Sequence, residues 1–241
     1  MDYDLKIMGG TIVDGTRAQG YRGDVGIKGG KITDLGTASG AAAETIDAEG
    51  RVICPGFVDI HTHYDAQILW DRMLSVSPWH GVTTAVVGNC GFGVAPMQEE
   101  HRETVMRTLE KVEGMAYEAL SAGLGSDWPF ITFPEYLDAV EDAGSAINVA
   151  AYVGHTPMRL FVMGHEATER EATHDEVEAM KGLVREAMAA GAIGFATSQA
   201  ATHHGAGGKP VPSRMASFGE IDALVGAMAE SGRGVMQAAM G

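Results

Sequence analysis

The chain has 241 residues, of which 45% are hydrophobic, and this is enough for one large domain or for a large domain with a small one. Its 17 Lys and Arg against 32 Asp and Glu give a formal net charge of -15, which disfavours nucleic acids and anionic membranes as partners and favours a small-molecule substrate. No apolar segment approaches the roughly 20 residues that cross a bilayer, and the N-terminus lacks the order of a signal peptide, so we expect a cytoplasmic location.

Residues 1–54 contain short alternating runs interrupted by glycines. The runs are DLKIMGGTIVDG, DVGIKGGKITDLG and ETIDAEGRVICPG. Gly29-Gly30, between DVGIK and KITDLG, is typical of a β-hairpin turn, because glycine tolerates the positive φ angles that such turns need. We therefore predict a small β subdomain over residues 1–54, with Cys54 packed in a core.

From Pro55 onward, apolar strands alternate with helices. Strands are predicted in FVDIHTH, TTAVVGNC, INVAAYVGH, AIGFATS and GVMQAAM, and helices in residues 98–120, PEYLDAVEDA, residues 175–190 and EIDALVGAMAES. This alternation predicts parallel βα units, in either an open doubly wound sheet or a (β/α)8 barrel. No glycine-rich phosphate-binding motif follows the first strand, so a dinucleotide-binding sheet is disfavoured. The predicted strands are about three fewer than a complete barrel needs, which predicts a partial barrel over residues 55–241.

Two of the predicted helices carry capping boxes, Thr173-x-x-Glu176 and Ser217-x-x-Glu220. In a capping box the hydroxyl and the carboxylate each accept a hydrogen bond from a free backbone N–H at the helix start. Both segments therefore predict helix starts, and the two helices are expected to end at Gly191 and Gly232.

His61 and His63 lie at the end of the first predicted strand after Pro55. Positions i and i+2 of a strand point to the same face, about 6.6 Å apart, so both imidazoles can converge on one ion. Cys90 ends the next strand, at the same edge of a parallel sheet. Imidazole nitrogen and thiolate sulfur are zinc ligands, so we predict that His61, His63 and Cys90 hold one or two zinc ions. Hydrogen-bonded histidines without a metal, and an inert buried cysteine, are the alternatives.

Four other residues are candidates for contact with a substrate or for support of the site. His155 ends the third predicted strand in VGHTPMR, which also contains Arg159. His203 and His204 lie in the polar, glycine-rich segment ATHHGAGGKPVPS, which could form a lid or a solvated connection. No catalytic acid or base is identified from the sequence.

Several segments together resemble one known family. PGFVDIHTHYDAQ, HGVTTAVVGNCGFGVAP, TFPEYLDAV, VGHTPMR followed by VMG, and GAIGFATS are similar to the N-acyl-D-amino-acid deacylases (D-aminoacylases) of the amidohydrolase superfamily. The resemblance extends from about residue 5 to about residue 235, and HTHYDAQ with GNCGFGVAP is its most specific part. It implies a (β/α)8 TIM-type barrel beside a small N-terminal β-sandwich subdomain, with zinc at the carboxyl ends of the strands.

The resemblance also implies residue roles and an activity. His61 and His63 match the first-strand metal ligands, and Cys90 matches the thiolate that replaces the carboxylated Lys of many relatives. AIGFATS contains no Lys, and the nearest one is Lys209. The implied reaction is hydrolysis of the linear amide of an N-acyl-D-amino acid by metal-activated water.

The last part of the chain departs from the family pattern. The later metal-binding histidines and the catalytic Asp of the family should lie near or beyond the C-terminus, and GVMQAAM offers Gln237 but no histidine. We therefore expect an N-terminal portion of such an enzyme, without turnover by the chain alone. The alternatives are an incomplete or inactive scaffold with the amidohydrolase fold, and a cyclic amidase of the dihydroorotase or hydantoinase type. The unpaired edge of a partial barrel also predicts self-association.

Overall fold

The computed structural model describes residues 1–240. The chain forms two compact units, Met1–Gly56 and Phe57–Gly241. The predicted boundary after residue 54 lies close to this division. No helix in the described part of the chain combines the length and apolarity that crossing a bilayer requires.

The first unit is a mixed five-stranded sheet. Its strands are β1 (Tyr3–Ile12), β2 (Tyr21–Lys28), β3 (Lys31–Gly36), β4 (Ala42–Asp47) and β5 (Val52–Ile53), in the order β3-β2-β1-β4 with β5 also paired to β1. The predicted hairpin is confirmed: β2 and β3 are antiparallel, and Gly29 and Gly30 between them have φ angles of +58° and +73°. Positive φ at both positions fits the turn type whose twist matches that of the strands. A second sheet, which a sandwich requires, is not among the described elements of this unit.

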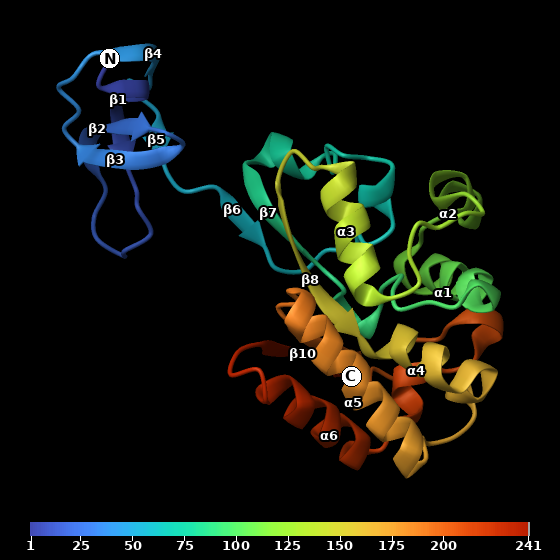
Figure 1. The fold of residues 1–241 in the computed structure, drawn as a ribbon. Coiled ribbons are helices and arrows are strands. Elements are labelled where there is room, and N and C mark those ends of the chain that lie inside the picture. The colour runs from blue at the N-terminus through green and yellow to red at the C-terminus, as the bar shows by residue number, and fades with distance from the viewer. Residues whose placement is uncertain (241) are drawn as a thin grey trace. The chain divides into compact units, whose positions relative to one another are not determined.

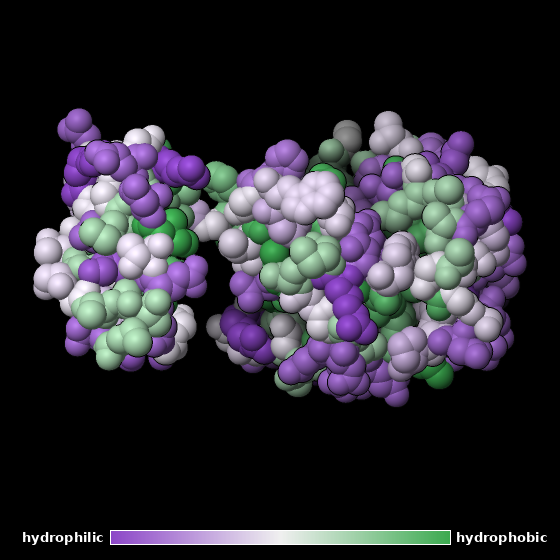
Figure 2. Space-filling view, turned by 90° about the horizontal axis from the view of Figure 1, so that it is seen from above, coloured by the Kyte–Doolittle hydropathy of each residue, from purple (hydrophilic) through white to green (hydrophobic). Residues whose placement is uncertain are grey.

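Part of this sheet leaves large apolar side chains at the surface. Ile32 is 66% exposed and Leu35 is 50% exposed. They line a hollow of about 340 Å³ together with Ile7 and Ile27. Cys54 also lines this hollow and is exposed, so the prediction that it packs in a core is wrong. Figure 2 shows hydrophobic residues among hydrophilic ones at the surface of this unit.

The second unit contains a five-stranded parallel sheet (Figure 1). Its strands are β6 (Phe57–Asp59), β7 (Val82–Val87), β8 (Asn148–Gly154), β9 (Gly194–Ser198) and β10 (Val235–Ala239). Their spatial order, β10-β9-β8-β7-β6, follows the order in the chain. A doubly wound sheet reverses its strand order at a switch point, and this sheet has no such reversal among its described strands. A curled sheet of sequential parallel strands fits part of a (β/α)8 barrel.

Six α-helices accompany this sheet. They are α1 (Arg102–Glu113), α2 (Tyr117–Leu124), α3 (Phe133–Ala143), α4 (His155–Met163), α5 (His174–Ala190) and α6 (Phe218–Ala229). The single helix predicted over residues 98–120 is wrong, because Gly114 (φ +69°) ends α1 and a second helix follows. Helix α4 was not predicted, since His155 directly after β8 was assigned to the strand end.

The two predicted capping boxes have different outcomes. At α5 both halves form, because Thr173 accepts from the backbone N–H of Glu176 while the Glu176 carboxylate accepts from that of Thr173. At α6 only Ser217 caps the helix, and the Glu220 side chain turns into the protein interior. Helix α5 is capped by Gly191 as predicted, whereas α6 ends at Ala229, before Gly232.

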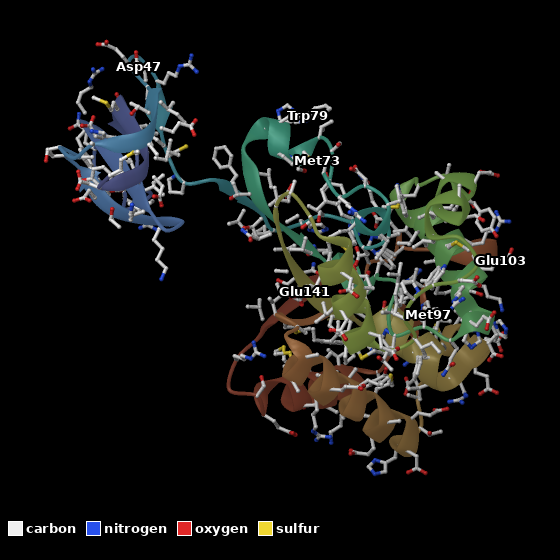
Figure 3. The ribbon with its side chains drawn as sticks, turned by 45° about the horizontal axis from the view of Figure 1, so that its top comes forward. Asp47, Met73, Trp79, Met97, Glu103 and Glu141 are labelled. Carbon is white, nitrogen blue, oxygen red and sulfur yellow. The ribbon has the colours of Figure 1, made fainter. Side chains whose placement is uncertain are left out.

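The core of this unit lies between the sheet and its helices. All residues of β9 are buried, as expected for a central parallel strand that is covered on both faces. Helices α3, α5 and α6 follow one another in space along the sheet (Figure 1). Glu103 on α1, labelled at the edge of the molecule in Figure 3, and Glu141 on α3 are exposed, whereas Val105 and Leu109 of α1 enter the core. The carboxyl ends of the strands are thereby held in a fixed arrangement.

Candidate metal centre

His61 and His63 lie just beyond the first strand of the parallel sheet. Strand β6 ends at Asp59, so the prediction that both histidines belong to the strand is wrong. Between them, the Thr62 backbone N–H and hydroxyl both donate to the carbonyl oxygen of Val86 on β7, at 3.1 and 2.7 Å. This tether holds the two rings side by side, with centroids 5.3 Å apart.

Cys90 lies in a short 3₁₀ turn (Asn89–Gly91) that follows β7. Gly88 and Gly91 have φ angles of +81° and +70°, and Cys90 itself has a φ of +57°. A Cβ atom on Gly88 would lie 2.3 Å from the Tyr152 carbonyl oxygen, and one on Gly91 would lie 2.7 Å from the Thr197 Cα. The turn is therefore packed closely against β8 and β9, and only glycine fits at these two positions.

The structure brings the three predicted metal ligands together. One potential ligand atom from each of His61, His63 and Cys90 lies within 4.8 Å of the other two. The Cys90 Sγ atom is 3.3 Å from the His61 Nε2 atom. Two imidazoles and a thiol form a donor set that suits zinc.

One orphaned polar atom of this cluster, and one on a nearby carboxyl group, also fit a cation. The His63 Nδ1 and Asp65 Oδ2 atoms are buried and have no hydrogen-bond partner among the described residues. Buried polar groups in proteins are nearly always paired, so the unpaired nitrogen of His63 and the unpaired carboxylate oxygen of Asp65 call for an explanation. A bound metal ion would supply one.

Burial drives the ionisable groups of the cluster toward their neutral forms. Burial lowers the pKa of His63 to about 4, and the neighbouring His61 and His203 act in the same direction. It raises the pKa of Asp65 to about 7 and, with the nearby Glu113 and Asp65 charges, the pKa of Cys90 to about 11. A cation would oppose these shifts for the thiol and the carboxyl group, because it stabilises their charged forms.

Three residues at this cluster were not predicted as site residues. Asp65 lies two residues after His63 in HTHYDAQ, so its position was the available clue. The Glu113 Oε2 atom, at the end of α1, lies 3.3 Å from the His63 Nε2 atom. The Gln237 Oε1 atom, on β10, accepts a hydrogen bond of 2.7 Å from the Cys90 backbone N–H. Nothing in the sequence around Glu113 or Gln237 indicates these contacts, which depend on the tertiary fold.

His155 and Arg159 lie in a separate, fully buried network. The His155 Nδ1 and Nε2 atoms are each 2.8 Å from a partner, Thr197 Oγ1 and Glu220 Oε1 respectively. Arg159 donates to both carboxylate oxygens of Glu220 and to the Arg170 carbonyl oxygen. Both His155 and Arg159 have 0% exposure, so they can act on a ligand only through other groups or after a rearrangement.

His203 and His204 occupy different environments in their loop. The His203 ring packs on Phe92 at a centroid distance of 5.2 Å, and Phe92 lies 6.3 Å from His63. Its Nδ1 atom is 2.7 Å from the Ser198 hydroxyl. His204 is exposed, and its Nδ1 atom lies 3.1 Å from the Thr202 carbonyl oxygen. His203 therefore borders the cluster, whereas substrate contact by either histidine stays a prediction.

Comparisons with known proteins show which family the chain belongs to. The family model described as "Amidohydrolase family" matches residues 44–239. D-aminoacylase from Alcaligenes xylosoxydans xylosoxydans is 39% identical over 196 residues, which are 81% of this chain and 37% of that protein. A D-aminoacylase crystal structure, said to define a novel subset of amidohydrolases, matches with a TM-score of 0.78 at 37% identity and covers 97% of this chain and 44% of that one.

A second solved relative carries a metal. N-acyl-D-glutamate deacylase from Bordetella bronchiseptica, complexed with zinc and a phosphonate inhibitor, matches with a TM-score of 0.77 at 32% identity, covering 99% of this chain and 45% of that one. The chain thus spans less than half the length of these relatives. The predicted relationship to the D-aminoacylases is confirmed, and the chain belongs to the amidohydrolase family.

Proposed function

We propose that the protein carrying this chain is a zinc-dependent hydrolase of N-acyl-D-amino acids, to which the chain contributes His61, His63 and Cys90 as metal ligands. The observation that carries the proposal is the convergence of these donors within 4.8 Å of one another. Relatives named D-aminoacylase, N-acyl-D-aspartate deacylase and N-acyl-D-glutamate deacylase, at 39%, 36% and 35% identity, support the substrate class.

The residues of the cluster suit this chemistry. When bound, zinc would lower the pKa of a water molecule and polarise the amide carbonyl group of the substrate. His63 stays neutral at pH 7, because burial lowers its pKa to about 4, and so keeps a nitrogen lone pair for a metal. The carboxyl groups of Asp65 and Glu113 provide oxygen atoms that can balance positive charge beside the ligands.

The proposal includes a complete (β/α)8 barrel and a β-sandwich subdomain in the whole protein. The sequential, curled parallel sheet of the second unit and the exposed apolar side chains on the sheet of the first unit support this architecture. We also propose a cytoplasmic location, with self-association through exposed strand edges.

The test compares the hydrolysis of N-acetyl-D-amino acids and their L-enantiomers by the whole protein after zinc reconstitution. We expect hydrolysis of the D-enantiomers, and loss of activity and zinc in His61→Ala and Cys90→Ala. His174→Ala, an exposed histidine at the start of α5, is the matched control and should change neither.

Other outcomes identify the alternatives. Ring opening of a hydantoin in place of deacylation would indicate a cyclic amidase. Stoichiometric zinc binding without hydrolysis of either substrate would indicate an inactive scaffold. Unchanged zinc content in both ligand variants would contradict the site assignment.

A further inference from the structure

A glutamine on the last strand contacts the turn that carries the thiol. The Gln237 Oε1 atom accepts a 2.7 Å hydrogen bond from the Cys90 backbone N–H, although the two residues are 147 positions apart. A backbone N–H can only donate, so the accepting atom must be the oxygen of the amide group. This partner fixes the orientation of the Gln237 amide, which is otherwise ambiguous.

The turn that Gln237 contacts has an unusual backbone conformation. Cys90 has a φ of +57°, in the left-handed region that residues with a Cβ atom rarely adopt. Such a conformation persists when the surrounding structure enforces it. Here the flanking glycines pack against Tyr152 on β8 and Thr197 on β9, and the Gln237 side chain binds the turn from β10.

We propose that Gln237 is a positioning residue, whose hydrogen bond to Cys90 holds the turn in the conformation that directs the thiol toward His61. The result of this positioning is the 3.3 Å distance between the Cys90 Sγ atom and the His61 Nε2 atom. The strand GVMQAAM, which lacks a histidine, would then serve the site through its glutamine. This inference deepens the proposed function, in which Cys90 is a metal ligand, but the position of the thiol does not depend on hydrolysis.

The test follows the reactivity of Cys90 in the metal-free chain. Cys54→Ser removes the second, exposed thiol, so that iodoacetamide reports on Cys90 alone. In this background, Gln237→Met keeps the side-chain length but removes the acceptor oxygen. We expect zinc to bind about tenfold more weakly, the size of effect that loss of one supporting contact has at metal sites. Alkylation of Cys90 should become faster, because a released turn exposes the buried thiol to the reagent.

Rescue separates positioning from a general structural effect. Gln237→Glu keeps an acceptor oxygen, and it should return the alkylation rate to within about threefold of the parent. Its zinc affinity should be at least that of the parent, because the added negative charge also favours a cation. Met236→Leu changes the neighbouring residue of β10 and should leave both quantities unchanged. If Gln237→Met matches the parent in rate and zinc affinity while its circular dichroism is native, the proposal is wrong.

A measurement on the unmodified chain covers the case in which Gln237→Met does not fold. Hydrogen exchange by NMR should show that the Cys90 amide proton is protected, because the Cys90 N–H donates a hydrogen bond to Gln237 Oε1. Exchange at the rate of a free amide would overturn the proposal. Absence of zinc binding in every variant would count against the proposed function, while alkylation and hydrogen exchange still decide the role of Gln237.

Discussion

Two histidine-containing regions of the second unit follow strands of the same sheet, yet they are built in opposite ways. His155 follows β8 and is bonded on both ring nitrogens, with no exposed surface. His63 follows β6, its Nδ1 atom has no partner among the described residues, and its side chain is 16% exposed. In the first region both nitrogens of the histidine are paired, and the Nε atom of Arg159 is its one buried side-chain atom without a partner among the described residues. In the second region a nitrogen of the histidine itself is unpaired, and a cation could be its partner.

This difference shows that the side chains around a histidine at a strand end decide whether its nitrogens are free to bind a ligand. Helix α6 delivers Glu220 to His155, and the same carboxylate binds Arg159. Burial by itself would raise the pKa of Glu220, but its bonds to His155 and Arg159 outweigh this and lower it. Burial also lowers the pKa of His155, so the network is a carboxylate paired with an arginine beside a neutral imidazole. Among the described residues, no arginine or lysine pairs in this way with a carboxyl group at the candidate metal centre.

The largest expected effect comes from removing the carboxylate of the buried network that Glu220 forms with His155 and Arg159. Glu220→Ala leaves the guanidinium of Arg159 buried without its carboxylate, and this should lower the free energy of unfolding by about 3–5 kcal/mol. Asp222→Ala, an exposed residue of the same helix, should change it by less than about 0.5 kcal/mol. Urea denaturation of both variants measures the difference. Equal stabilities would show that the network contributes little to the fold.

The second prediction removes a metal ligand from the candidate metal centre without unfolding the chain. Cys90→Ser should weaken zinc binding at least about a hundredfold, which corresponds to ~2.7 kcal/mol, because a hydroxyl is a much poorer zinc ligand than a thiolate. Competition with a chromogenic chelator measures the affinity, and the metal-free chain should keep native stability to within about 1 kcal/mol. If Cys90→Ser lost zinc affinity because the chain unfolded, Cys90 would support the fold as the buried network does, and the two regions would not differ in role.

A third prediction concerns the carboxyl group nearest His63. Glu113→Gln removes a negative charge from the centre and should weaken zinc binding about tenfold. The control is Glu110→Gln, one turn earlier on α1, whose carboxylate instead binds Arg107 and the Tyr117 backbone N–H. Titration calorimetry with zinc compares the two variants. Equal affinities would exclude Glu113 from the centre.

The smallest expected effect concerns Glu176, the capping-box glutamate that stays at the surface, in contrast to the buried Glu220. Hydrogen bonds from Arg170 are the main cause that lowers the pKa of Glu176 to about 2. Because the folded-state pKa is lowered, this stabilisation is complete above the ordinary Glu value of about 4.5 and is lost as the pH falls toward 2. Solvent screens the surface ion pair between Arg170 and Glu176, so we expect it to contribute only about 1 kcal/mol to the free energy of unfolding.

The matching experiment compares the unfolding free energies of the parent and Glu176→Gln at pH 6 and at pH 3. The variant should be less stable at pH 6, and the gap should narrow at pH 3. The exposed Glu186→Gln on the same helix should behave as the parent does. A gap that widens at low pH would contradict the direction of the shift.

Local patterns account for most of the elements that were predicted correctly. The five parallel strands and the hairpin at Gly29-Gly30 follow from apolar runs and glycine chemistry, which neighbouring residues decide. Thr173-x-x-Glu176 was correct because both partners lie within one helical turn. Ser217-x-x-Glu220 was half wrong, because the interior offered Glu220 two bonding partners that a solvated cap could not match.

The sequence by itself determined the βα pattern, the family resemblance and the identity of His61, His63 and Cys90 as candidate ligands, because strand ends and short motifs are local in the chain. Only the tertiary structure decided that Glu113 and Gln237 join this centre while His155 and Arg159 belong to another. These assignments depend on contacts such as that between Cys90 and Gln237, 147 residues apart. The burial of a side chain and the hydrogen-bond partners of its polar atoms are fixed only once distant segments have packed together.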